Sequence, residues 1–356
     1  AMTLVREMQR KEVTARGGIF VDIVPAFSTP DGAFTATGAD ETGEVRKLRA
    51  SDGVGFFKQG NNLMAQLVLA ALSGAGVLFV ESLTVGEAEL QLAPQLRVVQ
   101  QFGTQVDNID REACRRRNVP VRTLRRRTNI SVAEHTLAML LALVKRIPIL
   151  NGTVSEARMR AAGLPFRPFD KRHTAASNYV RAPGIGMLHG ATLGLLGFGE
   201  IASEVAAMAR PFGPRMLYHK RTRLTAAEEA AAGVAYCSFE DLFREADYVS
   251  VHVPMEDATR GLVGAQQFAL MKPGAAIINT SRAEIIDRAA LFDALQGGRL
   301  RGAALDVHYQ EPMPDDDPLL AMSNVILMPH TGGGSRLNGL ADMVEMLQGI
   351  QADLRR

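Results

Sequence analysis

A turn rich in small residues constrains this 356-residue chain more than any other feature of its sequence. The apolar run Thr192–Leu196 predicts a buried strand, and small residues then follow as Gly197, Gly199 and Ala202. This G-x-G-x-x-A spacing permits a tight turn, close approach of backbone amides to a pyrophosphate, and close packing of the next helix. A purely structural turn is the alternative, but the flanking pattern favours a dinucleotide site. Its predicted contacts are Gly197, Phe198, Gly199, Glu200 and Ile201.

Strands alternate with helices on both sides of this turn. The first series of candidate strands is Val77–Glu81, Leu96–Gln101 and Pro120–Thr123, with an apolar helix expected earlier at Leu63–Leu72. The second series is Thr192–Leu196, Arg215–His219, Val234–Cys237, Tyr248–Val253, Ala275–Thr280, Ala303–Asp306 and Val325–Met328. Such alternation indicates βαβ units around parallel sheets, so we expect an α/β protein with two doubly wound domains.

A long helix is expected between the two series. Ser131 and Glu134 have the spacing of a capping box, in which the serine side chain accepts from the third helical amide and the glutamate reaches back. The pattern therefore predicts a helix that begins at Ser131 and ends at Pro148. The polar stretch Asn151–Leu188 is expected to form loops with some helix between the domains.

Composition excludes several classes of protein. Hydrophobic residues make up 47% of the chain and charged residues 22%, which excludes a wholly disordered protein. The net charge of +2 argues against a nucleic-acid partner, and two cysteines cannot form a disulfide scaffold or a cysteine zinc site. No apolar run approaches the roughly 18 residues that span a bilayer. We expect a cytoplasmic protein with no membrane partner and no bound metal.

The residues after the second strand of the nucleotide domain bear on the choice of cofactor. An NAD site usually places an acidic residue here, on the ribose 2′-hydroxyl. This chain instead has Lys220, Arg221 and Thr222, which would donate charge-assisted hydrogen bonds to a 2′-phosphate. A solvated basic loop is the alternative. The sequence thus favours NADP(H), with NAD(H) still possible.

From about Leu96 to its end, the chain resembles the D-isomer-specific 2-hydroxyacid dehydrogenase family, which includes glyoxylate/hydroxypyruvate reductases. The resemblance rests on the glycine turn and on five further segments. They are Phe102–Asp110, Val132–Thr136, Ile277–Arg282, Leu305–Pro312 and Met328–His330. The first ninety or so residues match poorly.

The resemblance implies three catalytic residues. Arg282 would bind the substrate carboxylate and polarise its carbonyl, since a planar guanidinium suits both tasks. His330 would exchange a proton with the carbonyl oxygen, and Glu311 would fix the orientation of His330. Taken alone, each of these residues would more often be an ordinary surface or core group.

Other positions match the family less decisively. Thr104 and Gln105 correspond to a loop whose amides bind the substrate carboxylate. The resemblance also implies cofactor contacts at Pro254, Thr280 and Asp306.

The chain also departs from the family pattern. Gln105 and Ala283 stand where glycine is common, and arginines at 125–127 replace a Thr-Pro-Gly turn. Arg125 or Arg126 would either contact a second anionic group on the substrate or form a solvated loop.

The resemblance also implies a domain arrangement. A Rossmann nucleotide-binding domain, residues 137–325, would be inserted into a flavodoxin-like substrate domain formed by residues 1–136 and 326–356. A homodimer formed through the segment Ser131–Leu188 is expected. The expected reaction is reversible reduction of a 2-oxo acid to a D-2-hydroxy acid. Alternatives on the same scaffold are a phosphite-type or formate dehydrogenase, although formate enzymes lack the glutamate, and a dinucleotide-sensing corepressor.

Overall fold

The computed structural model describes residues 37–39, 45–47, 76–81, 84–166, 180 and 182–355. Contacts divide the chain into two compact units, one formed by residues 1–125 and 340–356 and the other by residues 126–339. The sequence placed the corresponding boundaries at residues 137 and 325. The predicted helix Leu63–Leu72 lies outside the described residues.

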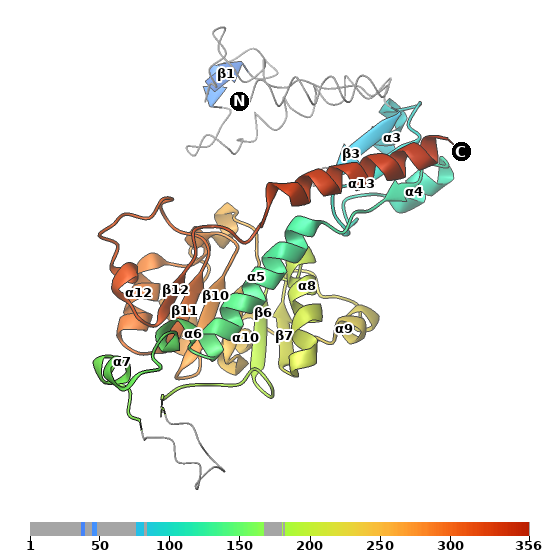
Figure 1. The fold of residues 1–356 in the computed structure, drawn as a ribbon. Helices are drawn as coiled ribbons and strands as arrows, with labels where there is room; N and C mark the ends of the chain where they lie inside the picture. The colour runs from blue at the N-terminus through green and yellow to red at the C-terminus, as the bar shows by residue number, and fades with distance from the viewer. Residues whose placement is uncertain are drawn as a thin grey trace. The chain divides into compact units, whose positions relative to one another are not determined.

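The unit of residues 126–339 is built on a parallel sheet of seven strands (Figure 1). The strand order is β12-β11-β10-β9-β6-β7-β8, which confirms the doubly wound sheet predicted from the sequence. The strands are β6 (Thr192–Leu196), β7 (Arg215–His219), β8 (Ala235–Tyr236), β9 (Tyr248–Val251), β10 (Ala275–Asn279), β11 (Leu300–Leu305) and β12 (Val325–Leu327). All carboxyl ends therefore meet at one edge, where such sheets bind ligands.

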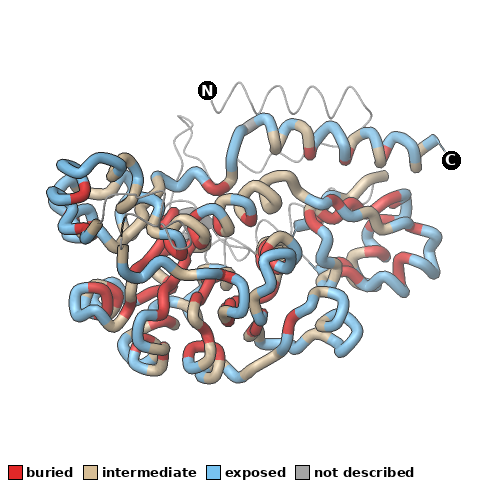
Figure 2. Tube along the Cα trace, turned by 60° about the horizontal axis from the view of Figure 1, so that its bottom comes forward, coloured by how far each residue is buried: buried red, intermediate tan, exposed pale blue. Residues whose placement is uncertain are grey.

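Two helical layers cover this sheet. The helices are α5 (Arg127–Val144), α6 (Ile147–Leu150), α7 (Glu156–Ala161), α8 (Glu200–Ala209), α9 (Ala226–Ala232), α10 (Phe239–Glu245), α11 (Ala265–Leu270) and α12 (Arg288–Gln296). One core joins α5 and α8 to side chains such as Leu195 and Ile278, and the other joins α10, α11 and α12 to Leu196 and Ile277. Successive strand residues thus enter opposite cores. Figure 2 shows buried residues in the interior of the molecule and exposed residues along its outer loops.

The other unit contains a three-stranded parallel sheet, β3 (Val77–Val80), β4 (Val98–Gln101) and β5 (Val121–Arg122), in the order β3-β4-β5. Helices α3 (Glu87–Leu92) and α4 (Arg111–Arg116) belong to it, as do the short strands β1 (Thr37–Ala39) and β2 (Val45–Lys47). Helix α13 (Arg336–Leu354) begins in the larger unit and ends in this one. Within this unit, Arg122 pairs with Asp353 at 2.8 Å, which holds the end of α13 to the sheet.

The long helix differs from its prediction at both ends. Helix α5 begins at Arg127, four residues before Ser131, so the predicted capping box is wrong. The Ser131 hydroxyl instead donates to the carbonyl oxygen of Gly332 at 2.9 Å. Pro148 does not end α5, because it lies in the first turn of α6, where its missing amide costs no hydrogen bond.

Candidate active site

The glycine turn has the geometry that a dinucleotide requires. Gly197 has φ of +90°, and a Cβ atom there would lie 2.8 Å from the backbone of His252. Gly199 is the N-cap residue of α8, and a Cβ atom there would meet nothing within 4 Å. The space beside Gly199 is thus open, and the first turn of α8 offers free amides and the positive end of a helix dipole, which suits a pyrophosphate. Phe198 and Ala202 are buried below the turn, whereas Glu200 and Ile201 retain exposure.

The basic residues after β7 have different partners. Arg223 is engaged by Glu229 through two hydrogen bonds of 2.8 and 3.0 Å. The Arg221 side chain is 84% exposed, and its nearest carboxylate oxygen, on Glu256, is 3.5 Å away. Lys220 is half-buried, and Thr222 is exposed beside it. Arg221 is therefore the guanidinium of this loop best able to turn toward a phosphate.

The structure brings together His330 and Glu311, as the sequence predicted. The Nδ1 atom of His330 lies 2.7 Å from Oε2 of Glu311, and the other oxygen of Glu311 accepts from the backbone amide of His308 at 3.0 Å. Glu311 carries no proton to donate once it is ionised, so Nδ1 is the donor. The Nε2 atom of His330 is thereby left to exchange a proton with a ligand.

The protonation state of Glu311 follows from its surroundings. Burial raises the pKa of Glu311, but the hydrogen bonds from His330 and from the His308 amide act in the opposite direction and outweigh it. The net pKa lies below the ordinary value of 4.5, so Glu311 is an anion at neutral pH.

Arg282 lies at the same edge of the sheet as this pair. It follows β10 and is exposed; one of its amino groups donates to the Ser281 carbonyl at 2.7 Å, and its own carbonyl accepts from Asn279 at 2.8 Å. His330 follows β12, and β11 lies between the two strands. Strands two apart are separated by about 10 Å, which is compatible with one small substrate contacting both side chains.

The remaining predicted cofactor residues also lie at this edge. Asp306 follows β11, is 2% exposed, and accepts from the amides of Thr331 and Gly332 at 2.9 and 2.8 Å. The hydroxyl of Thr280 lies 2.9 Å from that of Thr136, and Pro254 follows β9. Both oxygens of Asp306 thus support the turn after His330.

Thr104 and Gln105 belong to the other unit. They follow β4 and are exposed, and the loop is held by a 2.8 Å hydrogen bond from the Leu124 amide to the Gly103 carbonyl. Asp110 is the N-cap residue of α4, and its side chain accepts from the Ala113 amide. The role of Arg125 and Arg126 stays a hypothesis.

Sequence reasoning missed Ser131 and His135. Both lie on α5. Ser131 donates to Gly332 in the turn that carries His330, and Nε2 of His135 lies 3.2 Å from Oδ1 of Asp306, which binds the amides of that turn. The signal available was their spacing, since polar residues four apart share one face of a helix. The incorrect capping assignment hid it.

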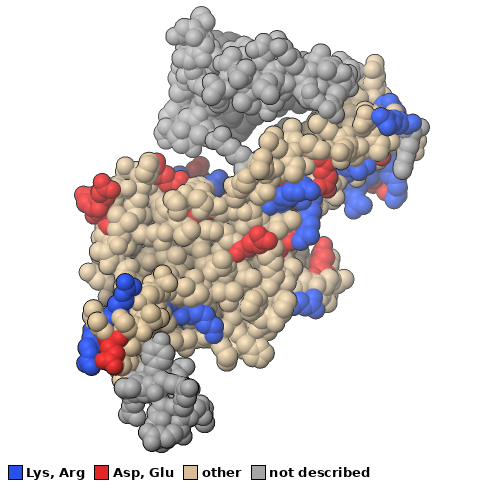
Figure 3. Space-filling model, viewed as in Figure 1, with Lys and Arg blue, Asp and Glu red and all other residues tan. Residues whose placement is uncertain are grey.

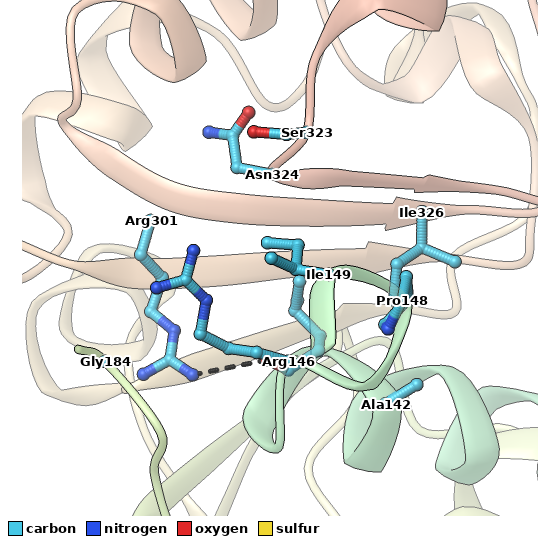
Figure 4. Close-up of a pocket in the computed structure, with 10 residues that line it drawn as sticks. Ala142, Arg146, Pro148, Ile149, Gly184, Arg301, Ser323, Asn324 and Ile326 are labelled. Carbon is cyan, nitrogen blue, oxygen red and sulfur yellow. Dashed lines mark hydrogen bonds between the residues drawn. The ribbon is translucent and has the colours of Figure 1, made fainter. Parts of the chain in front are cut away.

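A cavity at the opposite edge of the sheet is not part of this site (Figure 4). Its lining includes Arg301, at the start of β11, and Asn324, just before β12, whereas the site residues follow the carboxyl ends of the strands. Basic and acidic side chains are interspersed over the face shown in Figure 3. Among the described residues, no group of three potential metal ligands occurs, and no helix has the length and apolarity to cross a bilayer.

Comparison with known proteins identifies the class to which this sheet and site belong. The model of the D-isomer specific 2-hydroxyacid dehydrogenase family, NAD binding domain, matches residues 137–332, a range that includes Arg282, Glu311 and His330. The chain belongs to this family, as the sequence predicted. It is accordingly an oxidoreductase of the CH–OH group with a dinucleotide-binding domain.

Individual relatives agree with this assignment. Glyoxylate reductase of Korarchaeum cryptofilum is 35% identical over 71% of this chain and 72% of its own length. D-3-phosphoglycerate dehydrogenase of Methanocaldococcus jannaschii is 33% identical over 81% of this chain and 51% of its own. The structure of Aquifex aeolicus D-lactate dehydrogenase, complexed with NAD and lactic acid, has 27% identity and a TM-score of 0.51, with 81% of this chain and 85% of that chain covered.

A second family model matches the beginning of the chain. Residues 1–71 match a family of proteins of unknown function, DUF459. This segment coincides with the part of the sequence that matched the dehydrogenases poorly. The assignment of residues 1–71 to the substrate domain stays a prediction.

Proposed function

We propose that this protein reduces a 2-oxo acid to a D-2-hydroxy acid at the carboxyl edge of the seven-stranded sheet. Bound dihydronicotinamide would supply the hydride that reaches the substrate carbonyl carbon. Arg282 binds the substrate carboxylate and polarises the carbonyl. Nε2 of His330 gives its proton to the carbonyl oxygen as negative charge develops there, while Glu311 holds Nδ1 and fixes the orientation of the ring.

The 2.7 Å contact between His330 and Glu311 is the observation that carries this proposal. It orients one ring nitrogen and leaves the other for the substrate. Glu311 also distinguishes the proposal from formate oxidation, which in related enzymes proceeds without this glutamate. The structure does not distinguish the proposal from phosphite oxidation or from a sensing role, so the experiment below tests both alternatives.

The test follows nucleotide absorbance against a panel of 2-oxo acids, including glyoxylate, hydroxypyruvate and pyruvate, with phosphite and NAD(P)⁺ in a parallel arm. We expect turnover with at least one 2-oxo acid and its loss in His330→Ala. Turnover of phosphite alone, or tight nucleotide binding with no turnover of any substrate, would contradict the proposal.

We propose NADP(H) as the preferred nucleotide. Arg221 supports this because its guanidinium is exposed and its contact with Glu256 is long at 3.5 Å. No carboxylate occurs in the sequence from Tyr218 to Arg223 to accept a ribose 2′-hydroxyl. The expected result is a lower KM for NADPH than for NADH, and the reverse order would contradict the assignment.

We propose that the protein is a homodimer formed through the segment from α5 to Leu188. Four large apolar side chains of this segment are exposed in the single chain: Ile147, Val154, Ile185 and Met187. Exposed apolar side chains gathered in one segment are typical of an interface. Sedimentation should show a dimer, and Ile147→Asp with Met187→Asp should shift it toward monomer; a wild-type monomer would contradict the proposal.

A further inference from the structure

The turn that carries His330 has an unusual backbone conformation. His330 has φ of +55°, in the left-handed region that residues other than glycine rarely adopt. A residue is held there only when surrounding contacts determine it. The backbone amide of His330 donates to the carbonyl oxygen of Met328 at 2.9 Å, on the side of the preceding residues. The contacts of the residues that follow His330 also restrain its backbone, and with it the position of the imidazole.

Asp306 supplies two of these contacts. Its two carboxylate oxygens accept separately from the Thr331 and Gly332 amides, which are the first two amides after His330. At 2% exposure this carboxylate is almost fully removed from water. A buried anion needs hydrogen bonds or a cation to be stable, and the two amides provide part of that requirement.

Helix α5 supplies two further contacts, one to the turn and one to the Asp306 carboxylate. The Ser131 hydroxyl donates to the Gly332 carbonyl at 2.9 Å, and Nε2 of His135, four residues later, lies 3.2 Å from Oδ1 of Asp306. This second contact has the distance of an ion pair without the alignment of a good hydrogen bond. The Nε2 atom is enclosed by protein, so Asp306 is the partner that the structure offers it.

Gly332 shows how closely these groups surround the turn. A Cβ atom there would lie 2.8 Å from Oδ2 of Asp306 and 3.4 Å from Cδ2 of His135. The carboxylate and the imidazole therefore both lie close to the position that a side chain at Gly332 would occupy. No larger residue fits without displacing one of them.

We propose that Ser131 and His135 are positioning residues that act on His330 through Asp306 and Gly332. The proposal rests on the proposed function for its effect on catalysis. Ser131 fixes the carbonyl side of the turn, and His135 restrains the carboxylate that holds its amide side. Together they keep the imidazole of His330 against Glu311. Neither residue contacts the reacting atoms.

The test uses the full chain with His135→Leu, Ser131→Ala and the double variant. His135→Gln is the rescue variant, because its amide reaches the position of Nε2. Glu134→Gln, on the exposed side of the same turn of α5, is the matched control. We expect kcat to fall about tenfold in His135→Leu and further in the double variant, with the KM for nucleotide changed less than about threefold. His135→Gln should recover most of kcat.

A spectroscopic measurement separates this inference from the proposed function. The chain has seven histidines, and comparison with His330→Asn identifies the Cε1–H resonance of His330. We expect that resonance to shift or broaden in His135→Leu and Ser131→Ala and to stay unchanged in Glu134→Gln. An unchanged resonance with kcat within about twofold of wild type would overturn the inference. Absence of turnover in the wild type would contradict the proposed function while the resonance still tests the positioning role.

Discussion

The two units of this molecule differ in how much of their chemistry the sequence reveals. The unit of residues 126–339 has a seven-stranded sheet covered on both faces, and it matches one family through residue 332. The other unit has a three-stranded sheet in its described part, and its first 71 residues match a different family. The predicted catalytic residues and nucleotide contacts fall in the first unit, whereas Thr104 and Gln105 fall in the second.

We expect the larger unit to determine the type of reaction and the other unit to determine which substrate is bound. In the proposed reaction the chemistry is assigned to Arg282, Glu311 and His330, all at one edge of the larger sheet. The residues expected to select among 2-oxo acids belong to the unit whose sequence departs from the relatives. The comparison therefore predicts large effects on turnover from substitutions in the first unit, and small effects from structural contacts in the second.

Replacement of Arg282 should have the largest effect. In Arg282→Gln the charge and the planar fork are both lost, so kcat/KM should fall about 10³-fold, or about 4 kcal/mol of transition-state stabilisation. The dissociation constant of the nucleotide, measured by fluorescence, should stay within about threefold of wild type. A change of less than tenfold in kcat/KM would contradict the assignment of Arg282 to the active site.

Glu311→Gln should have the next largest effect, with kcat lowered about 10²-fold. The pKa of Glu311 is lowered, so this carboxylate is charged throughout the neutral range and its contribution is lost only as pH falls through that lowered value. A neutral amide does not titrate, so Glu311→Gln should lack the fall in rate at acid pH that protonation of Glu311 produces in wild type. An unchanged pH profile would show that the charge is not used.

His252 should make the stability of the larger unit depend on pH. Burial lowers the pKa of His252 from its ordinary value of 6.5 to about 4 in the folded protein. Its Nε2 atom forms a hydrogen bond of 2.8 Å with the hydroxyl of Ser250. The unfolded chain therefore binds a proton first as pH falls, and unfolding free energy should decrease by about 2 kcal/mol between pH 7 and pH 5. Chemical denaturation of wild type and His252→Gln at several pH values measures this decrease. The same dependence of unfolding free energy on pH in both proteins would contradict the assignment to His252.

Arg221→Ala should raise the KM for NADPH about tenfold and leave the KM for NADH unchanged, since only NADPH carries the 2′-phosphate. Arg223→Gln is the matched control, because Glu229 already binds that guanidinium. Equal changes for both nucleotides would show that Arg221 does not distinguish them.

The smallest effect is expected in the other unit. Arg122 and Asp353 form an ion pair whose side chains are 37% and 15% exposed. Such pairs near the surface stabilise by at most about 1 kcal/mol, so Arg122→Gln should lower the unfolding free energy by no more than that. The kcat should not change. A large loss of kcat in Arg122→Gln would contradict the expectation that structural contacts in this unit have little effect on turnover.

The sequence predicted the larger sheet well because each strand has a strong local signal. The runs Thr192–Leu196 and Ala275–Asn279 are buried throughout and mostly apolar, as is typical of parallel strands covered on both faces. Glu311 and His330 were predicted through the resemblance to the family, and the structure places their side chains 2.7 Å apart. Local patterns therefore predicted the sheet, whereas the resemblance predicted this pair.

The sequence failed where a tertiary contact decided the structure. Ser131 has the local pattern of a helix cap, but α5 begins four residues earlier and the hydroxyl bonds to Gly332, some two hundred residues away. The contact of His135 with Asp306 is equally non-local. No periodicity or spacing in the sequence reports such pairs, since they arise only when the strands bring distant turns together.

The central claim is that His330 transfers the proton in a reaction whose other components bind without it. The most direct measurement is single-turnover reduction of the preferred 2-oxo acid by His330→Asn, with nucleotide affinity measured on the same sample. The account predicts a rate at least about 10³-fold below wild type and a nucleotide dissociation constant within about threefold. A rate within about tenfold of wild type, at unchanged affinity, would contradict it.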